Sequence, residues 1–441
     1  MTDTTPPDST SRHETAPTRP TAAVVGGGVS GLTAAYLLAR THHVTLFEAE
    51  NRVGGHAHTH DVALADGSVV AVDSGFIVLN DRTYPLLRRL LSELDVETRP
   101  AEMSMGTSCD ECGLTYVGGR GAGGIFTQRR RVADPRFWRL LLSIRRFQKA
   151  ALALLADDPD GTMSYGEFLD RHRFDAYFRH HYALPVVACV WSMGDDEALA
   201  YPAAYLFAFL ANHGFLVIGD APTWHTVVGG SRAYVERVTA GLDAVRVAAR
   251  VTAVSRKPDG VEVDTAAHDG RPAEHHRFDK VVLATHADDA LSLLTDAGED
   301  EHDLLGAFGY STNTAYLHRD LAVLPGRRRD RASWNYRLHG CATTADRSRV
   351  SYWMNRLQGH PEQDPLVVTL NPHDGDEPRD VVAVMTYTHP TYTAASVAAQ
   401  RRLPELNTDR LAFAGAYHGW GFHEDGCRSG VAAAAALGAV W

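Results

Sequence analysis

The chain has 441 residues, of which 44% are hydrophobic and 22% charged. This composition is ordinary for a globular protein and excludes disorder as the main state. The formal net charge of −11 at pH 7 argues against general nucleic-acid binding. Because the chain is too long for one compact core, we expect more than one domain.

Residues 1–20 contain four prolines and six threonines but no aliphatic run. We interpret them as a disordered tail that lacks the apolar core of a secretory signal. No stretch approaches the ~20 apolar residues that a membrane-spanning helix needs. The five cysteines, without a secretion signal, indicate reduced thiols and a cytoplasmic protein.

The first predicted unit directly follows the tail. Residues 21–25 form an apolar strand pattern that runs into Gly26, Gly28 and Gly31 and then into an Ala- and Leu-rich helix. A second strand pattern ends at Glu48, 20 residues after Gly28. The GxGxxG dinucleotide-binding fingerprint requires this strand, glycine turn, helix and acid. We therefore predict a dinucleotide site.

Each residue of the fingerprint has a physical role. Gly26 permits the tight turn, Gly28 the close approach of a pyrophosphate, and Gly31 close packing of the helix on the strand. The phosphates are expected at the N-terminus of the helix, where backbone N–H groups are unpaired. Glu48 is expected to accept hydrogen bonds from the adenosine ribose.

The residues after Glu48 distinguish between dinucleotides. Arg52, Gly54 and Gly55 continue the pattern as E-x3-R-x-G-G, which resembles FAD enzymes of the amine oxidase and phytoene desaturase type. Two adjacent glycines let the backbone pass close to the flavin end of a cofactor. The resemblance implies FAD.

Three histidines, His56, His58 and His60, alternate in the next segment. On a strand, His56 and His60 would lie roughly 13 Å apart, whereas zinc lies about 2.1 Å from a histidine nitrogen. These two histidines cannot share one ion, and no partner motif for an adjacent pair is evident. We predict no metal site here and a loop beside the flavin, with one or more histidines facing the ring.

Cys109 and Cys112 form a CxxC motif without a second cysteine pair. Zinc or redox sites of this kind normally need further ligands. We interpret the motif as a turn between two short strands.

Residues 129–149 are strongly basic, with eight arginines and lysines against the single acid Asp134. Apolar residues recur at helical spacing among them, which predicts a basic amphipathic helix. Such helices lie on anionic membrane surfaces, although a packed helix with a solvated basic face is the simpler alternative. The apolar stretch 201–215 suits the wall of an acyl channel or an ordinary core helix.

Later segments complete the cofactor domain. The pattern of residues 224–238 predicts a strand, a Gly-Gly turn and a helix. Around Val251 the pattern predicts strands joined by an Asp259-Gly260 hairpin turn. Residues 278–291 are expected to form a buried strand that ends at Ala284-Thr285 and is followed by a helix. Residues 410–438 predict a strand, an aromatic loop and a small-residue helix that begins near Gly426, with its N-terminus directed at the flavin.

The whole chain after the tail resembles the bacterial family of predicted NAD/FAD-binding flavoproteins found beside cyclopropane-fatty-acid-synthase-like methyltransferases. The stretches that carry the resemblance are "VVGGGVSGLTAAYLL", "NRVGGHAHTH", "DSGFIVLNDRTYPLL", "WHTVVGGSRAYVERV" and "GAYHGWGFHEDGCRSGVAAA". Some members are implicated in desaturating methyl-branched acyl chains, so the resemblance implies a hydrophobic or lipid substrate. It also makes a methyltransferase a candidate partner.

Two departures separate this chain from the better-known amine oxidases. Those enzymes usually have Glu after the Ala-Gly of the last strand, where this chain has Ala416, and a lysine that contacts the flavin through water. The strand that we expect to be equivalent in this chain, residues 309–320, contains no lysine. Amine oxidation with fast oxygen reduction is therefore disfavoured.

We predict an α/β fold class: a Rossmann-like FAD-binding domain with a discontinuous α+β substrate domain, as in amine oxidase-like flavoproteins. The FAD-binding domain is expected to comprise residues 21–75, 223–299 and 406–441, and the substrate domain residues 76–222 and 300–405. The residues expected at the cofactor are Gly26, Gly28, Val29, Ser30, Gly31, Glu48, Ala49, Arg52, Gly54, Gly55, His56, Gly75, Phe76, Val251, Ala284, Thr285, Gly415, Asp425, Gly426 and Cys427.

The function hypothesis is an FAD-dependent oxidoreductase of desaturase or dehydrogenase type, which transfers hydride from an acyl chain to flavin N5. Alternatives are a redox-neutral double-bond isomerase, an amine or carotenoid oxidase, and a flavin-stabilised scaffold for a methyltransferase. We expect no metal, no nucleic acid, and a cytoplasmic protein whose residues 129–149 make an anionic membrane surface a candidate partner. The residues expected near the flavin ring are His56, His58, Tyr417, Trp420, Phe422 and His423.

Overall fold

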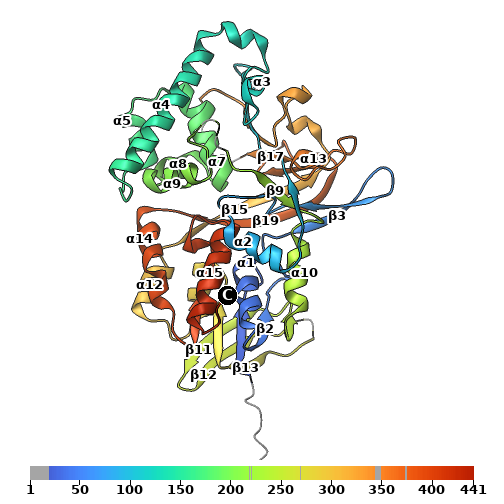
Figure 1. Cartoon of the computed structure of the whole chain (residues 1–441), viewed down its shortest axis with the longest axis vertical. Coiled ribbons are helices and arrows are strands. Elements are labelled where there is room, and N and C mark those ends of the chain that lie inside the picture. Colours follow the sequence, from blue (N-terminus) through green and yellow to red (C-terminus); the bar gives the residue numbers. More distant parts are fainter. Residues whose placement is uncertain (1–18, 218, 220, 269, 343–348, 373–374) are drawn as a thin grey trace, which may run out of the picture.

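The computed structural model describes residues 19–217, 219, 221–268, 270–342, 349–372 and 375–441. Residues 1–18 of the predicted tail lie outside this range, and residues 19 and 20 are exposed. Figure 1 shows two stacked parts, with the N-terminal strands and the C-terminal helix in one and a helical lobe at the far end of the other.

The cofactor part is built on a parallel sheet in the order β10-β2-β1-β14-β20. Its strands are β1 (Thr21–Val25), β2 (His43–Phe47), β10 (Ala244–Arg246), β14 (Lys280–Leu283) and β20 (Leu411–Phe413). Alternate residues of β1 belong to two different hydrophobic clusters, Ala22 and Val24 to one and Ala23 and Val25 to the other. Both faces of the sheet are therefore covered, as parallel sheets require.

Helices cover one face and a small antiparallel sheet the other. The helices are α1 (Val29–Leu38), α10 (Arg232–Ala240) and α15 (His423–Ala436), and the sheet is β11 (Val251–Lys257), β12 (Gly260–Thr265) and β13 (Glu274–Phe278). The predicted Asp259-Gly260 hairpin and the predicted strand before α11 (Ala287–Leu293) are confirmed. α15 begins at His423, three residues earlier than predicted, because the Asp425 carboxylate caps its N-terminus by accepting from the Phe422 N–H.

The other part contains a seven-stranded mixed sheet in the order β19-β15-β18-β17-β16-β7-β8. Its strands are β7 (Met105–Cys109), β8 (Thr115–Gly118), β15 (Gly309–His318), β16 (Trp334–Leu338), β17 (Val350–Trp353), β18 (Val367–Leu370) and β19 (Val381–Thr391). The helical lobe consists of α4 (Pro135–Asp157), α5 (Tyr165–Arg171), α6 (Ala176–Phe178), α7 (Leu184–Trp191), α8 (Asp195–Ala200) and α9 (Ala203–Asn212).

The other strands and helices are short. They are β3 (Thr59–Ala63), β4 (Val69–Asp73), β5 (Leu79–Asn80), β6 (Thr98–Pro100), β9 (Trp224–Val227), α2 (Pro85–Glu93), α3 (Gly121–Ile125), α12 (Glu299–Leu305), α13 (Met354–Leu357) and α14 (Ala394–Arg402). β9 pairs with β5 and β6, so the predicted domain boundary at residue 223 adjoins a sheet that both parts share. Among the described helices, none is long and apolar enough to cross a membrane.

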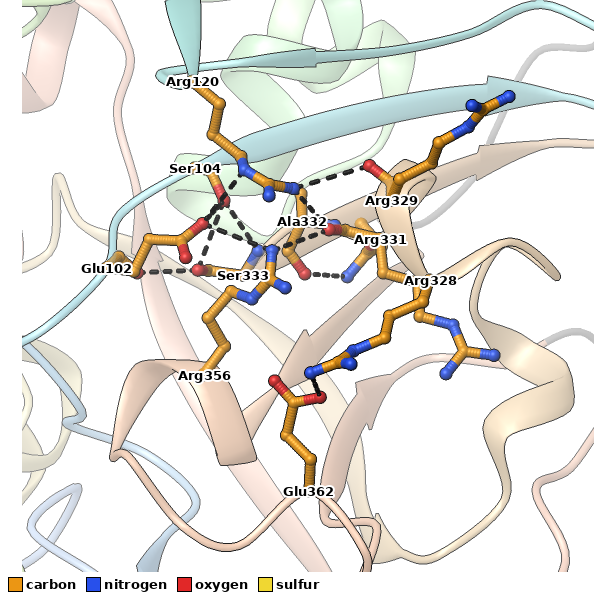
Figure 2. A network of polar contacts seen from close by, with 11 residues as sticks. Glu102, Ser104, Arg120, Arg328, Arg329, Arg331, Ala332, Ser333, Arg356 and Glu362 are labelled. Atoms are coloured by element: carbon orange, nitrogen blue, oxygen red, sulfur yellow. Dashed lines mark hydrogen bonds and ion pairs between the residues drawn. The ribbon is translucent and has the colours of Figure 1, made fainter. Parts of the chain in front are cut away.

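A polar network aligns the first residues of β7 with those of β16 (Figure 2). The Glu102 carboxylate accepts from Ser104 at 3.0 Å and pairs with Arg356 at 3.3 Å. The Ser333 hydroxyl donates to the Glu102 carbonyl at 2.6 Å, and the Ser333 N–H donates to the Ser104 hydroxyl at 3.0 Å. The network thereby fixes the parallel register that pairs Trp334 with Met105.

The predicted amphipathic helix corresponds to α4, but its apolar face is turned into the protein. Phe137, Leu140 and Phe147 are buried. The Phe147 ring lies 5.5–6.1 Å from six other aromatic rings, those of Tyr165, Phe168, Phe174, Phe178, Tyr182 and Phe207. This face therefore packs against the core of the helical lobe.

Two substitutions on α4 distinguish its faces. We expect Phe147→Ala to lower the free energy of unfolding by about 3–5 kcal/mol, because it opens a cavity in the aromatic cluster. Leu142, which is 68% exposed on the same helix, should change stability by less than about 0.5 kcal/mol when replaced by Ala. Equal losses for the two variants in chemical unfolding would contradict the packing described here.

Candidate active site

One cavity of about 590 Å³ runs between the carboxyl ends of the parallel strands and the helical lobe. Ligands of open parallel sheets bind outside these strand ends. Among the residues expected at the cofactor, those that line the cavity are Gly26, Gly28, Val29, Ser30, Glu48, Ala49, Gly55, His56, Gly75, Phe76, Val251, Ala284, Thr285 and Gly415. The structure thus brings most of the predicted set to one surface.

The three fingerprint glycines have distinct surroundings. Gly26 has a φ of +104°, which favours glycine, and a Cβ there would lie 2.5 Å from the Ala284 carbonyl oxygen. A Cβ on Gly31 would lie 2.0 Å from the Gly26 oxygen, whereas one on Gly28 would meet no atom within 4 Å. Gly26 and Gly31 therefore permit close packing, while Gly28 leaves open space at the N-terminus of α1.

Glu48 directly follows β2 and lines the cavity. Its two carboxylate oxygens accept from the N–H groups of Gly27 and Glu50, each at 2.8 Å. Arg52 does not line the cavity; its guanidinium pairs with Glu50 at 3.1 Å, and its Nη1 is buried without a hydrogen-bond partner among the described residues. Gly54 does not line the cavity either, because its Cβ position lies 2.4 Å from the Ala57 oxygen.

The three alternating histidines separate into two groups. His56 lines the cavity, and its Nε2 is buried without a partner among the described residues. His58 and His60 do not line the cavity, and their tilted rings lie 4.2 Å apart. His58 hydrogen-bonds to the Tyr387 hydroxyl at 3.1 Å, and His60 to the Ser74 hydroxyl at 2.8 Å. His58, expected near the ring, does not itself line the cavity but contacts the lining residues Tyr387 and Ser74.

The loop before α15 supplies the other predicted residues. Tyr417, Trp420, Phe422 and His423 all line the cavity. The His423 ring stacks on Phe76 at 3.7 Å. Its Nε2 and the Tyr417 hydroxyl are buried without partners among the described residues.

Three predicted cofactor residues lie behind this loop rather than on the cavity wall. Asp425 caps α15 and pairs with Arg428 at 2.5 Å. Gly426 lies against α1, where a Cβ would come within 2.6 Å of the Val29 side chain, and Cys427 is fully buried. Their observed contacts support the helix and its packing on α1.

Sequence reasoning missed His389, Tyr387 and His286, which also line the cavity. Tyr387 and His389 occupy alternate positions of β19 with the buried Met385. The spacing of two between Met385, Tyr387 and His389 was the sequence pattern that could have predicted that all three lie on one face of a strand. The partner strand β15 confirms the strand expected at residues 309–320, but its pairing with β19 could not be predicted from periodicity.

A chain of amides fixes the tautomer of His389. The Thr314 N–H donates to Asn371 Oδ1 at 3.0 Å, so Asn371 Nδ2 must donate to Asn313 Oδ1, 2.7 Å away. Asn313 Nδ2 then donates to His389 Nδ1 at 3.0 Å. His389 Nδ1 is the acceptor, and the neutral ring carries its proton on Nε2.

Three histidines of the cavity, His56, His389 and His423, have lowered pKa values. Burial lowers the pKa of His389 to about 4 and that of His423 to about 3. Burial, with the nearby His389, also holds the pKa of His56 well below its ordinary value. Without a carboxylate partner, a buried imidazolium is disfavoured. These groups offer hydrogen bonds and proton-accepting nitrogens but little charge.

The wall contributed by residues 76–222 and 300–405 is apolar and aromatic. Among its described lining residues there is no Asp, Glu, Lys or Arg. The lining residues of α7, α9 and the neighbouring strands include Ile77, Val78, Met103, Val190, Trp191, Phe209, Phe215, Trp334, Tyr352 and Leu370. This part of the cavity suits an uncharged, hydrophobic ligand.

Residues 29–375 match the family model described as flavin containing amine oxidoreductase. The chain belongs to the flavin-containing amine oxidoreductase family. It is an FAD-dependent oxidoreductase, and the amine oxidase-like fold predicted from the sequence is confirmed.

Curated relatives match short segments only. Carotenoid phi-ring synthase of Streptomyces griseus is 44% identical over 77 residues, which are 17% of this chain and 15% of the relative. Tryptophan 2-monooxygenase of Allorhizobium ampelinum is 57% identical over 44 residues, 10% of this chain and 6% of the relative. The matches therefore span far less than two thirds of either relative.

Solved structures share the fold over nearly the whole chain. A CLA-producing fatty acid isomerase from P. acnes has a TM-score of 0.65 at 16% identity and covers 93% of this chain and 97% of its own. Cyclohexylamine oxidase from Brevibacterium oxydans IH-35A has a TM-score of 0.67 at 15% identity, with coverages of 95% and 98%. At these identities the likeness shows the fold alone.

The residues present fit FAD. The open space at Gly28 adjoins the unpaired N–H groups of α1, as a pyrophosphate requires. The wall at the far end of the cavity carries the unpartnered polar atoms of His56, Tyr417 and His423. Buried polar atoms without partners are rare in proteins, so these atoms are expected to face a polar ligand.

Gly28→Ala tests the phosphate position. Gly28 has φ −73° and ψ 179°, a conformation that Ala adopts freely, so the fold should be retained. The added methyl group would occupy the space beside the helix N-terminus, and we expect FAD content per chain to fall at least ~tenfold. Gly123→Ala, another site with nothing within 4 Å of the Cβ, is the matched control. Full FAD occupancy in Gly28→Ala would contradict the assignment.

Asn313→Asp tests the neutral state of His389. In the wild type the folded pKa of about 4 lies below the unfolded value of ~6.5. The stability contributed by His389 is therefore complete above pH ~6.5 and lost as the pH falls toward 4. A carboxylate at position 313 would accept from Nδ1 and raise the folded pKa of His389.

We therefore expect acidification from pH 7.5 to pH 5 to cost Asn313→Asp less stability than the wild type, by on the order of 1–2 kcal/mol. The comparison is made by chemical unfolding at both pH values. In a His389→Asn background, Asn313→Asp should lose this effect. Identical pH dependence in the wild type and Asn313→Asp would show that His389 is not held as described.

Proposed function

We propose that this flavoenzyme acts on an acyl chain, oxidising a C–H bond by a dehydrogenase or desaturase reaction. The observation that carries the proposal is the uncharged aromatic and aliphatic wall contributed by residues 76–222 and 300–405. A buried wall without carboxylates or cations favours apolar ligands, because a charged ligand would lose its hydration without compensation.

Different residues of the chain would hold the cofactor and contact the substrate in such a reaction. The turn at Gly26–Ser30 and Glu48 would hold the cofactor phosphates and ribose. FAD, when bound, supplies the two-electron acceptor for a hydride. His56 and His423 each present a buried Nε2 without a partner among the described residues, and this atom can form a hydrogen bond with a substrate group.

The aromatic loop is positioned to keep water out of the site. The Trp191 indole N–H donates to the Trp420 carbonyl at 3.1 Å, and Phe422 stacks on Phe209 at 4.7 Å. Gln400 donates to the Tyr417 and Gly419 carbonyls, each at 2.7 Å. These contacts fix the loop against the helical lobe and α14 and close the wall around the substrate end.

A redox-neutral double-bond isomerase is the second candidate. It would use the same residues and return the hydride to another carbon of the chain, and its support is the shared fold with a fatty acid isomerase. Amine oxidation is less well supported, because no lysine lines the described cavity and its substrate wall has no carboxylate.

A charge placed in the wall tests the proposed substrate class. We expect the wild type to turn over unsaturated fatty acids or phospholipids, and Val190→Glu to lower kcat/KM for them at least ~100-fold, because the carboxylate would be desolvated in the acyl path. Val190→Met should stay within a few fold of the wild type, and FAD content should be unchanged in both variants. Retained acyl turnover by Val190→Glu, or peroxide release with simple amines instead, would refute the proposal.

Docking on an anionic membrane is also proposed, through the outer face of α4. Trp138 and Leu142 are 45% and 68% exposed, and the exposed cations Arg145 and Lys149 continue the same helical face. Apolar side chains flanked by cations are typical of helices that bind anionic lipid surfaces. The face differs from the buried one that the sequence periodicity emphasised.

We expect the double variant Trp138→Ala and Leu142→Ala to bind phosphatidylglycerol vesicles at least ~tenfold more weakly than the wild type, since both side chains would otherwise enter the lipid interface. Vesicle co-sedimentation at low and high salt measures this, and added salt should weaken wild-type binding. Equal binding by the wild type and the double variant would exclude this face.

A further inference from the structure

Four potential metal ligands from three distant segments converge outside the active site. They are Cys109, Cys112, His181 and Cys341, and their ligand atoms all lie within 4.8 Å of one another. The CxxC motif does form a turn between β7 and β8, as the sequence predicted. The other two partners are 69 and 232 residues away from it along the chain, which is why the motif seemed isolated.

The distances within the cluster match tetrahedral zinc coordination. With Zn–S bonds of about 2.3 Å and Zn–N bonds of about 2.05 Å, tetrahedral geometry places two sulfurs about 3.8 Å apart and a sulfur and a nitrogen about 3.6 Å apart. The Cys109 and Cys341 sulfurs are 3.7 Å apart, and the Cys112 sulfur lies 3.6 Å from His181 Nε2. We propose that these four residues bind a structural Zn²⁺ ion in a Cys3His site.

The surroundings of His181 prepare it as a ligand. The residue lies in a π-helical turn, η2 (Arg179–Ala183), and is fully buried. Its Nδ1 lies 2.9 Å from the Tyr177 carbonyl oxygen, and since a carbonyl only accepts, Nδ1 carries the proton. This leaves the lone pair of Nε2 facing the sulfurs, the arrangement usual for zinc-bound histidine.

The cysteine turn has the backbone geometry of a thiolate knuckle. The Cys109 sulfur accepts from the Cys112 N–H, and the Cys112 sulfur from the Leu114 N–H. Gly113, with φ +58°, supplies the left-handed residue that brings the Leu114 N–H back to the sulfur. Hydrogen bonds from N–H groups stabilise the thiolate form that binds metals.

Charge around the cluster is also suitable. Three thiolates and one Zn²⁺ leave a net charge of −1 after the three thiol protons pass to solvent. Arg131 donates to the Cys112 carbonyl at 2.8 Å, and Arg130 to the Gly113 carbonyl at 3.1 Å. Two arginines of the basic segment thus support the turn and partly balance the charge of the site.

The site would join the sheet to the helical lobe. Cys109 ends β7 opposite Leu338 of β16, at the end of the strand pair away from the Figure 2 network. Cys341 follows β16, and His181 precedes α7, whose last turn lines the cavity with Val190 and Trp191. The zinc ion would therefore hold α7, and with it the substrate wall, against the sheet.

The competing arrangement is a disulfide between Cys109 and Cys341. A disulfide requires sulfurs about 2.05 Å apart and would give Cys112 and His181 no shared role. The zinc site explains all four residues together.

Elemental analysis of the purified full-length flavoprotein tests the proposal. We expect about one zinc ion per chain in the wild type, and background zinc in Cys112→Ser and Cys341→Ser. Cys189→Ala, which removes a buried cysteine outside the cluster, should keep the zinc. FAD content and circular dichroism confirm that each variant is folded.

X-ray absorption spectroscopy of the wild type tests the proposal even if a variant does not fold. X-ray absorption at the zinc edge should show three sulfurs at about 2.3 Å and one nitrogen at about 2.0–2.1 Å. The proposal is overturned if the reduced protein binds no Zn²⁺ when incubated with a stoichiometric excess, if the bound zinc has oxygen-rich ligands, or if freshly purified protein contains a Cys109–Cys341 disulfide.

Discussion

The close approach of α1 to the parallel sheet and to α15 is the constraint on which the active site depends. A Cβ on Gly31 would lie 2.0 Å from the Gly26 oxygen, and one on Gly430 would lie 2.4 Å from the Ser30 oxygen. Any side chain at these positions would push α1 away from one neighbour or the other. Because α1 stays in place, its unpaired N–H groups border the cavity directly above the carboxyl end of β1, where cofactor phosphates bind in this class of fold.

The two sides of the cavity differ in chemistry, and this difference connects the fold to the function. The cofactor side offers backbone groups and the Glu48 carboxylate, whereas the substrate side is apolar and aromatic. Between them lie histidines that burial keeps neutral, one of them fixed by the Asn371–Asn313–His389 chain. Such a site suits a hydrocarbon chain and hydrogen bonds to uncharged groups but is poorly suited to stabilising a buried charge.

Local patterns predicted the cofactor domain well, because the glycine turn, Glu48 and the Asp259-Gly260 hairpin each depend on neighbouring residues. Periodicity also identified the amphipathic α4, but it could not show that the Phe147 face packs on aromatic residues from four other helical segments. His389 entered the site only through the pairing of β19 with β15. Likewise, Cys341 and His181 lie far from the CxxC motif along the chain and come close to it only in the folded protein, so the local sequence could not show that the four residues form one cluster.

We propose that a C–H bond of a hydrocarbon chain is oxidised in this cavity. Anaerobic titration of the purified yellow protein with vesicles that contain unsaturated or methyl-branched acyl chains tests it most directly, with the visible flavin absorption followed throughout and the lipid analysed afterwards. We expect bleaching of the flavin together with a new double bond in the chain. A moved double bond with an unbleached flavin would assign the isomerase reaction instead. An unbleached flavin and unchanged lipid, with bleaching by a simple amine, would contradict the account.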